Sequence, residues 1–247
     1  MADGWSRLTE SVRTGQTAAE VMRHEGMASL WSRDPGAMEI FRSVMGAGPV
    51  EDYDAIVDDC ELGDSKVCAD LGGGAGALMM SILDRYPRIH GLLVERPGTI
   101  KNAEQRFTAA AYASRSTLVS GDLSHEVPSG ADVYLLKHVL HGYRDEEAEE
   151  ILRRCHQAMR VTARLMVIEF VMPEVISSAD PRIAQRAMSD LTMLAITRGR
   201  ERTLAEWSGL LSRSGFVLNA VRNVADGSLS VIEAQPVVQQ KDPPHAS

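Results

Sequence analysis

A run of glycines stands where a short apolar segment gives way to a helical pattern. Gly72 opens the run, Gly74 follows, and Asp70 lies two residues before the first glycine. Glycines in such a turn allow a tight bend and let backbone N–H groups approach a ligand closely. With Ala77 they fit the GxGxxA dinucleotide pattern, and Glu95 is placed to accept hydrogen bonds from both ribose hydroxyls of a nucleoside. A turn that serves packing alone is the weaker interpretation, because strand, loop, helix and acid are in register.

Two cofactor classes fit this loop, a nicotinamide dinucleotide and S-adenosylmethionine, because both carry an adenosine. Asp70 lies where a carboxylate can reach an amino-acid ammonium, directly or through water, and NAD has no such group. Asp122 follows a later apolar segment and can accept a hydrogen bond from the adenine amino group, although an aspartate there is as often a loop cap. Asp70, Glu95 and Asp122 all end predicted strands, at the edge where open α/β sheets bind ligands. The three acids favour S-adenosylmethionine.

A sheet must hold these residues, and the chain alternates between β-rich and helical segments from Lys66 onward. Segments that are apolar on both faces and separated by helices predict a parallel sheet covered on both sides. Asp226-Gly227 is a hairpin signal between the last two segments. The predicted fold class is α/β, a Rossmann-like, doubly wound and mostly parallel seven-stranded sheet with an antiparallel C-terminal hairpin. The predicted strands are 66–70, 90–95, 116–120, 131–138, 163–171, 216–225 and 229–234, and the predicted helices are 78–85, 99–113 and 145–159.

Residues 1–48 predict a short helical arm rather than a domain with its own core. Apolar residues recur at helical spacing in two stretches, and a run of breakers at 46–49 ends the arm. We expect it to pack on the domain that follows, residues 49–236, which would bind the cofactor and carry the chemistry. Residues 237–247 predict a disordered tail. The apolar positions of the arm are Trp5, Leu8 and Val12, then Met38, Phe41 and Met45.

The composition excludes several other classes of function. The 247 residues carry 26 Lys+Arg against 34 Asp+Glu, a net charge of −8, and an acidic chain gains nothing from counterion release on nucleic acid. Cys60, Cys68 and Cys155 are too few and too irregularly spaced for a disulfide framework or a zinc site. No apolar run approaches the roughly 18 residues of a membrane span, and the N-terminus has no apolar signal region. We expect a cytoplasmic protein without nucleic-acid, membrane or metal partners.

The glycine loop and four later stretches resemble the catalytic domain of small-molecule O-methyltransferases, the plant caffeate and flavonoid type and their bacterial polyketide-tailoring relatives. The resemblance covers about residues 5–236, and its five motifs occur in the family's order. It implies S-adenosylmethionine as cofactor and an aromatic or polyketide acceptor. The motifs are residues 67–100, 120–123, 135–155, 167–174 and 188–216. The cofactor residues that the resemblance implies are Gly72 and Gly74 along the cofactor, Glu95 at the ribose, Asp122 and Leu123 at the adenine, and Lys137 near the methionyl part.

The fourth strand leads into a loop with His141, which matches the catalytic histidine of the family's His-Asp-Trp or His-Asn-Trp motif. A phenol has a pKa near ~10, and a positioned imidazole that removes its proton supplies roughly 10²–10⁴-fold in rate. Glu169 and Glu201 match glutamates that flank that histidine in the family. Glu169 also lies in an apolar strand, where a carboxylate needs a partner, whereas Glu201 alone would be a surface loop residue beside Thr203, an N-cap candidate. His138 is expected to pack or support rather than react.

Two features depart from the family pattern. Gly142 and Tyr143 replace the usual Asp or Asn and Trp, which keeps an aromatic wall but is expected to loosen the loop. Members usually carry a winged-helix dimerisation domain before the catalytic domain. We expect it to be absent here, and the site to be open or completed by a second copy or a partner chain. Met172, Met188 and Met193 are candidates for lining an acceptor pocket, although ordinary core methionine fits them equally.

The leading prediction is an S-adenosylmethionine-dependent O-methyltransferase that acts on a hydroxyl of a phenolic or polyketide-type natural product. His141 would be the base, with Glu169 and Glu201 in support. One alternative is a non-methylating relative, similar to a hydroxylase or decarboxylase, that keeps the cofactor bound. Another is an accessory subunit that needs a partner chain. The retained loop histidine favours methyl transfer, and a nicotinamide oxidoreductase is the least favoured class.

Overall fold

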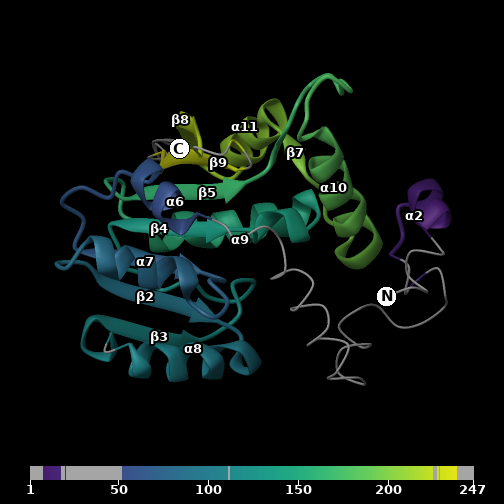
Figure 1. The fold of residues 1–247 in the computed structure, drawn as a ribbon. Helices are drawn as coiled ribbons and strands as arrows, with labels where there is room; N and C mark the ends of the chain where they lie inside the picture. The colour runs from purple at the N-terminus through teal and green to yellow at the C-terminus, as the bar shows by residue number, and fades with distance from the viewer. Residues whose placement is uncertain are drawn as a thin grey trace, which may run out of the picture.

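A seven-stranded sheet lies between two layers of helices in a computed structural model, which describes residues 8–17, 20, 52–110, 112–224, 227 and 229–237 (Figure 1). The strand order is β3-β2-β1-β4-β5-β9-β8. The neighbours from β3 to β5 are parallel, whereas β9 runs antiparallel to both β5 and β8. The order reverses between β1 and β4, and ligands of open α/β sheets bind at such a switch point. The predicted fold class is confirmed.

Each predicted strand is present, with bounds shifted by no more than a few residues. Strand β5 is buried along almost its whole length, as expected of a strand covered on both faces, and β3 at the sheet edge is more exposed. The last two strands pair across the predicted turn, where Gly227 has a φ of +65°. The strands are β1 Val67–Leu71, β2 His90–Glu95, β3 Ser116–Ser120, β4 Val133–Lys137, β5 Arg164–Glu169, β8 Phe216–Asn223 and β9 Ser230–Pro236.

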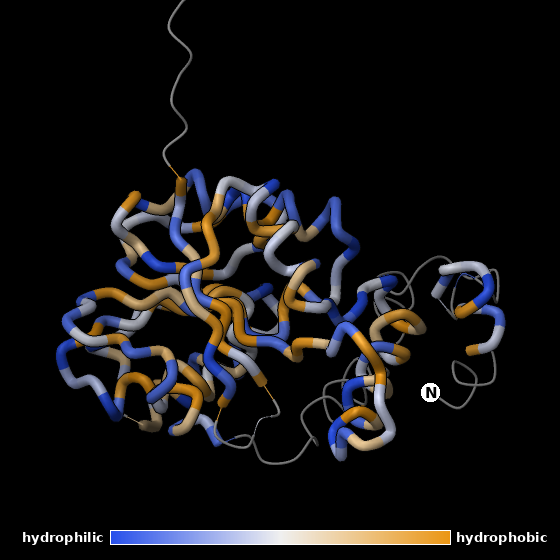
Figure 2. The backbone as a smooth tube through the Cα atoms, turned by 90° about the horizontal axis from the view of Figure 1, so that it is seen from above, coloured by the Kyte–Doolittle hydropathy of each residue, from blue (hydrophilic) through white to orange (hydrophobic). Residues whose placement is uncertain are grey.

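The helices bury apolar residues against both faces of this sheet. One face carries a core that includes Ile56, Met79 and Phe107, and the other carries a core around Leu152 and Trp207. Apolar segments accordingly gather at the centre of the molecule and polar ones at its surface (Figure 2). Helices α6 Tyr53–Asp59, α7 Ala77–Arg85 and α8 Pro97–Ala109 cover the first face, and α9 Asp145–Ala158 and α11 Leu204–Arg213 cover the second.

The N-terminal helix α2, Leu8–Thr14, packs against α10, Ile183–Thr197, away from the sheet (Figure 1). Its buried side is not the expected apolar face, because Val12 is 57% exposed whereas Ser11 is buried. Trp5 and the apolar residues at 38–45 lie outside the described residues, as does the tail from 238. The division into arm, domain and tail therefore stays a prediction.

A second, two-stranded sheet was not predicted, because each of its strands has only two residues. Val171–Met172 forms β6 and Arg202–Thr203 forms β7, and Val171 pairs with Arg202. Helix α11 then begins at the predicted N-cap, where Thr203 Oγ1 accepts from the Glu206 backbone N–H at 3.3 Å. The pair β6–β7 brings the end of β5 beside the segment that precedes α11. Among the described residues, none of the helices combines the length and apolarity that crossing a membrane requires.

Candidate functional site

The glycine loop joins β1 to α7 at the carboxyl edge of the sheet. Gly72 and Gly74 have φ values of +73° and +60°, in the left-handed region that favours glycine. A Cβ at Gly73 would lie 2.2 Å from Asp70 Oδ2, so no side chain fits there. A Cβ at Gly74 would meet no atom within 4 Å. The loop is therefore packed on its inner side, against Asp70, and open on the side where a ligand can approach.

Asp70 is completely buried, and neither carboxylate oxygen has a hydrogen-bond partner among the described residues. Burial raises the pKa of Asp70 to about 7, although the nearby charge of Lys137 opposes the shift and Glu95 adds to it. A buried carboxylate without a partner is costly. A cationic ligand group that arrived at the glycine loop would remove this cost, which fits the ammonium of S-adenosylmethionine.

Glu95 and Lys137 lie at the ends of β2 and β4, on the same edge. Glu95 Oε2 accepts from the Gly74 backbone N–H at 3.1 Å, and Oε1 accepts from the Arg96 N–H at 2.8 Å. The Lys137 ammonium lies 5.4 Å from the centre of the Tyr53 ring. The predicted ribose acid is thus tied directly to the glycine loop.

Asp122 is engaged within its own loop. Its Oδ1 accepts from the Ser124 backbone N–H at 2.9 Å and from the Ser124 hydroxyl at 2.7 Å. These hydrogen bonds, the hydroxyl's first, hold the pKa of Asp122 below its usual value. Leu123 is buried, and its Cδ1 lies 3.7 Å from where a Cβ at Gly72 would be. Asp122 therefore caps the loop, and its contact with adenine stays a prediction.

His141 lies in a short 3₁₀ helix, Leu140–Gly142, that follows β4, and only 5% of it is exposed. Its Nδ1 lies 2.9 Å from Glu201 Oε1 and 3.5 Å from Glu169 Oε2. The structure thus brings together three residues that are 28 and 60 positions apart along the chain. Two carboxylates beside one imidazole nitrogen orient the ring.

Glu169 ends β5, and its carboxylate is fully buried. Its Oε1 accepts from the backbone N–H groups of Val139 and His141, at 3.0 and 3.3 Å. Burial alone would raise the pKa of Glu169, but the charges of His141 and His138 and the backbone contact outweigh it, so that the pKa lies below its usual value. An ionised Glu169 therefore holds both the backbone and the imidazole of the histidine loop.

Glu201 is only 4% exposed, so the local interpretation of this residue as a surface loop residue is wrong. Two residues of α10, which the sequence analysis missed, hold it in place. The Ser189 hydroxyl donates to Glu201 Oε1 at 2.6 Å, and the Glu201 backbone N–H donates to Asp190 Oδ1 at 2.9 Å. Burial, followed by the charge of Glu201, raises the pKa of Asp190, although the backbone hydrogen bond opposes them. Both residues lie in the stretch 188–216 that resembles the family, and this was the sequence signal that could have drawn attention to them.

His138 stacks on His141, with ring centres 5.2 Å apart and an interplanar angle of 26°. Its Nδ1 lies 3.4 Å from Glu169 Oε2, and its φ of +52° is unusual for a residue other than glycine. His138, His141 and Glu169 could in principle hold a metal ion, since their ligand atoms lie within 4.8 Å of one another. The Nδ1 atoms of His138 and His141 lie 3.4 and 3.5 Å from Glu169 Oε2, and Nδ1 of His141 also contacts Glu201. The arrangement suits an ion-pair cluster better than a metal site.

The remaining candidates are scattered. A Cβ at Gly142 would meet no atom within 4 Å, and Tyr143 packs against the core beside α9. Met193 is buried, Met188 is 53% exposed, and Met172 is half-buried in β6. The three methionines therefore share no common environment, and the acceptor pocket is not assigned to them.

Removing the charge of Glu201 tests its support of the imidazole. A hydrogen bond to a charged group contributes about 1.5–3 kcal/mol, so Glu201→Gln is expected to lower kcat for the methyl transfer that the sequence predicts by roughly 10–100-fold. The KM for S-adenosylmethionine should change little, because Glu201 lies away from the glycine loop. Steady-state kinetics measure both, with Glu150→Gln on the exposed side of α9 as the matched control. A full kcat in Glu201→Gln would contradict the support role.

The fold and this edge of the sheet together define a class. A sheet in the order 3-2-1-4-5 with an antiparallel pair at its end, a glycine loop after β1 and an acid at the end of β2 are the features of Rossmann-like methyltransferases. The model of the O-methyltransferase domain matches residues 5–217, and the chain belongs to this family.

Similar proteins agree with this membership. The chain is 33% identical over 229 residues to the mitomycin biosynthesis 6-O-methyltransferase of Streptomyces lavendulae, covering 93% of this chain and 64% of that protein. It is 33% identical over 233 residues to the phenazine O-methyltransferase PhzM of Lysobacter antibioticus, covering 94% and 67%. The chain thus spans about two thirds of the length of these relatives. A solved structure of the O-methyltransferase NcsB1, with S-adenosylmethionine and 2-hydroxy-5-methyl naphthoic acid, matches with a TM-score of 0.82 and 28% identity over 95% of this chain and 68% of NcsB1.

Proposed function

We propose that the protein is an S-adenosylmethionine-dependent O-methyltransferase that methylates a hydroxyl of a phenolic or polyketide-type natural product. The observation that carries the proposal is the 2.9 Å contact between His141 Nδ1 and the buried carboxylate of Glu201. It lies at the sheet edge that also holds the glycine loop and the unpartnered Asp70. An imidazole backed by a carboxylate beside a nucleoside-binding loop suits proton removal coupled to group transfer. The family membership supports the same activity.

His141 is the general base in this proposal. Its Nδ1–H donates to Glu201, a tautomer assigned from the hydrogen-bond network, so Nε2 is left to accept the proton of the acceptor hydroxyl. The charges of Glu201 and Glu169 then stabilise the imidazolium until the proton passes to solvent. When bound, S-adenosylmethionine would supply a sulfonium methyl group: an O–C bond to the acceptor would form in line as the C–S bond breaks, and S-adenosylhomocysteine would be the leaving group. An acceptor oxygen held beside the base and the methyl carbon gains several kcal/mol, on the order of proximity effects in general.

The cofactor residues follow from the same edge of the sheet. The open side of the glycine loop, the unpartnered carboxylate and the acid at the end of β2 support a nucleoside with an amino-acid tail. The residues proposed are Asp70 at the ammonium, Gly72 and Gly74 along the cofactor, Glu95 at the ribose, Asp122 and Leu123 at the adenine, and Lys137 near the methionyl part.

The acceptor class rests on the relatives, whose names refer to mitomycin biosynthesis and to phenazine, and on NcsB1 with its naphthoic acid. Phenazine and naphthoic acid are flat aromatic compounds. We therefore expect a flat aromatic acceptor that carries a hydroxyl group.

Mass spectrometry of the product tests the proposal. The purified protein is incubated with S-adenosylmethionine and a panel of hydroxynaphthoic acids, hydroxyphenazines and simpler phenols. Methyl transfer adds one CH₂ unit to the acceptor and releases an equal amount of S-adenosylhomocysteine. A product that is oxidised or decarboxylated, with S-adenosylmethionine unconsumed, would instead assign the chain to the non-methylating branch of the family. Calorimetric binding of S-adenosylmethionine and S-adenosylhomocysteine, but not of NADH, is expected beforehand.

Two further predictions belong to this proposal. Cys60, Cys68 and Cys155 are all buried and unpaired, which is typical of a reducing compartment, so we place the reaction in the cytoplasm.

A homodimer or a complex with a partner subunit is expected from the family resemblance. Size-exclusion chromatography with light scattering measures the oligomeric state.

A further inference from the structure

Arg202 is one of the largest side chains that are completely buried, and it lies in β7 directly after Glu201. Its guanidinium is covered by the ring of Trp207, whose centre is 5.1 Å from Cζ. Arginine is almost never fully buried unless it is paired. Its partners therefore explain why it is there.

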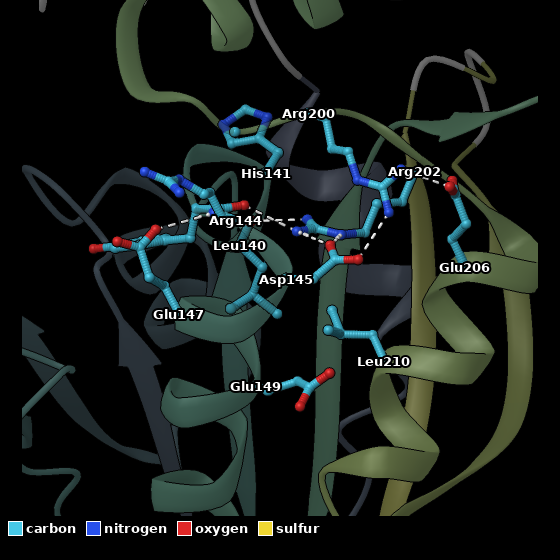
Figure 3. A network of polar contacts seen from close by, with 12 residues as sticks. Leu140, His141, Arg144, Asp145, Glu147, Glu149, Arg200, Arg202, Glu206 and Leu210 are labelled. Atoms are coloured by element: carbon cyan, nitrogen blue, oxygen red, sulfur yellow. Dashed lines mark hydrogen bonds and ion pairs between the residues drawn. The ribbon is translucent and has the colours of Figure 1, made fainter. Parts of the chain in front are cut away.

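Those partners stand before and after His141 along the chain, and Figure 3 shows Arg202 directed towards Leu140 and Asp145. Nη1 donates to the Leu140 carbonyl at 2.9 Å, and Nη2 donates to the Tyr143 carbonyl at 2.9 Å. Nε and Nη2 also donate to Asp145 Oδ1, at 3.0 and 2.9 Å, where α9 begins. One planar group thus holds the residue before His141, the residue two positions after it, and the first residue of the following helix.

The loop needs such support because its own sequence gives it little. Gly142 has no side chain with which to fix its backbone. The segment before β7 lies directly against the loop: a Cβ at Gly199 would be 1.9 Å from the His141 carbonyl oxygen and 2.9 Å from Gly142 Cα. The backbone of the histidine loop is therefore packed on one side by Gly199 and hydrogen-bonded by Arg202.

We propose that Arg202 is a positioning residue that fixes the carbonyl groups of the His141 loop, in place of a side chain at position 142, while Glu169 holds N–H groups of the same loop. A guanidinium presents five N–H donors in a rigid plane, which matches carbonyls in different directions, whereas a lysine offers three donors from one point. The pairing of β6 with β7 fixes Arg202 in turn to the strand that follows Glu169. Arg202 acts through the loop and touches neither acceptor nor cofactor in this proposal.

Arg202→Lys tests this inference, which rests on the proposed function for its kinetic part. With an acceptor that the wild-type protein methylates, kcat is expected to fall about 10–100-fold, because one to two good hydrogen bonds to the loop are lost. The KM for the acceptor and the calorimetric Kd for S-adenosylhomocysteine should stay within about threefold of wild type. Arg200→Lys is the matched control. Arg200 bonds Asp145 and Glu206 in the same network but is 44% exposed and touches neither loop carbonyl (Figure 3).

A spectroscopic readout separates this inference from the proposed function. In protein labelled with ¹⁵N-histidine, the His141 signals are assigned by their loss in His141→Gln. In Arg202→Lys these signals should shift and broaden, while those of His90 and His156 keep their positions. This result supports the inference even if no acceptor is methylated by the wild-type chain, an outcome that would count against the proposed function alone.

Three outcomes would overturn the inference. One is a folded Arg202→Lys with wild-type kcat or wild-type His141 signals, and another is an equal loss of kcat in Arg200→Lys. Arg202→Gln is the second variant if the lysine variant does not fold. It leaves no buried charge, and Asp145 keeps its contact with Arg200. If neither variant folds, the role of Arg202 is stability of the fold, and the positioning proposal fails.

Discussion

His141→Ala is expected to lower kcat for methyl transfer by roughly 10²–10⁴-fold, the contribution of a positioned general base. The acceptor hydroxyl then loses the imidazole that takes its proton, and little phenolate is present at neutral pH. The Kd for S-adenosylhomocysteine should change by less than threefold, since the ring lies beside Glu201 and Glu169 rather than at the glycine loop. Single-turnover kinetics with a validated acceptor, together with calorimetry, measure both quantities.

His90→Ala is the control for this prediction. His90 begins β2, at the opposite end of the strand from Glu95, and its ring contacts Thr117 at 2.8 Å. Its replacement should leave kcat unchanged. The loss in His141→Ala should also shrink with acceptors whose hydroxyl is more acidic, because these ionise without help. A constant loss across such a series, or full turnover by His141→Ala, is incompatible with proton removal by this residue.

Binding of S-adenosylmethionine is expected to strengthen as the pH rises towards 7. The pKa of Asp70 is about 7, raised by burial, and the ligand ammonium pairs with the ionised carboxylate. Below the pKa, ligand binding must release a proton, so the apparent Kd should fall by about tenfold for each pH unit between pH 5 and 7, and level off above pH 8. Calorimetry at five pH values measures this dependence.

Asp70→Asn separates this effect from other titrations. The variant should bind S-adenosylmethionine weakly at pH 8, and its Kd should lose most of its pH dependence below pH 7. Without ligand, a raised carboxyl pKa makes the folded wild-type chain lose stability as the pH rises from about 3.8 to about 7. In thermal unfolding, Asp70→Asn should therefore be more stable than wild type at pH 7. The difference in stability between the two proteins should be smaller at pH 4. If the Kd for S-adenosylmethionine changes equally with pH in wild type and in Asp70→Asn, the pH dependence belongs to another group.

The sheet was predictable from local patterns, and so was the position of the glycine loop and the acids at one edge of it. The buried strands are apolar on both faces, the glycine loop follows the first of them, and the acids of this edge stand at strand ends. Each of these signals lies within about ten residues of sequence. The antiparallel pair was predictable from Asp226-Gly227 for the same reason, and Thr203 from its capping pattern.

The support of His141 was only partly predictable. Glu169 was suspected because a carboxylate in an apolar strand needs a partner, whereas the burial of Glu201 depends on α10, a helix far from it in sequence. Ser189, Asp190 and Arg202 were missed, since their hydrogen bonds run to residues more than ten positions away and to backbone carbonyls that any sequence presents. The predicted packing of α2 was wrong at Val12. A helix of seven residues makes too few contacts for its apolar pattern to decide which side is buried.

The short pair β6–β7 has a consequence for how this chain can vary. It joins the segment after Glu169 directly to the segment after Glu201, so the pair ties together the two segments that carry these glutamates. The connection from β6 to α10 begins at an exposed loop, with Val175 and Ile176 79% and 69% exposed. Changes of length in that loop are absorbed at the surface, as insertions at exposed loop tips usually are. Descendants of this sequence can therefore lengthen or shorten the loop while the pairing beside both glutamates is kept.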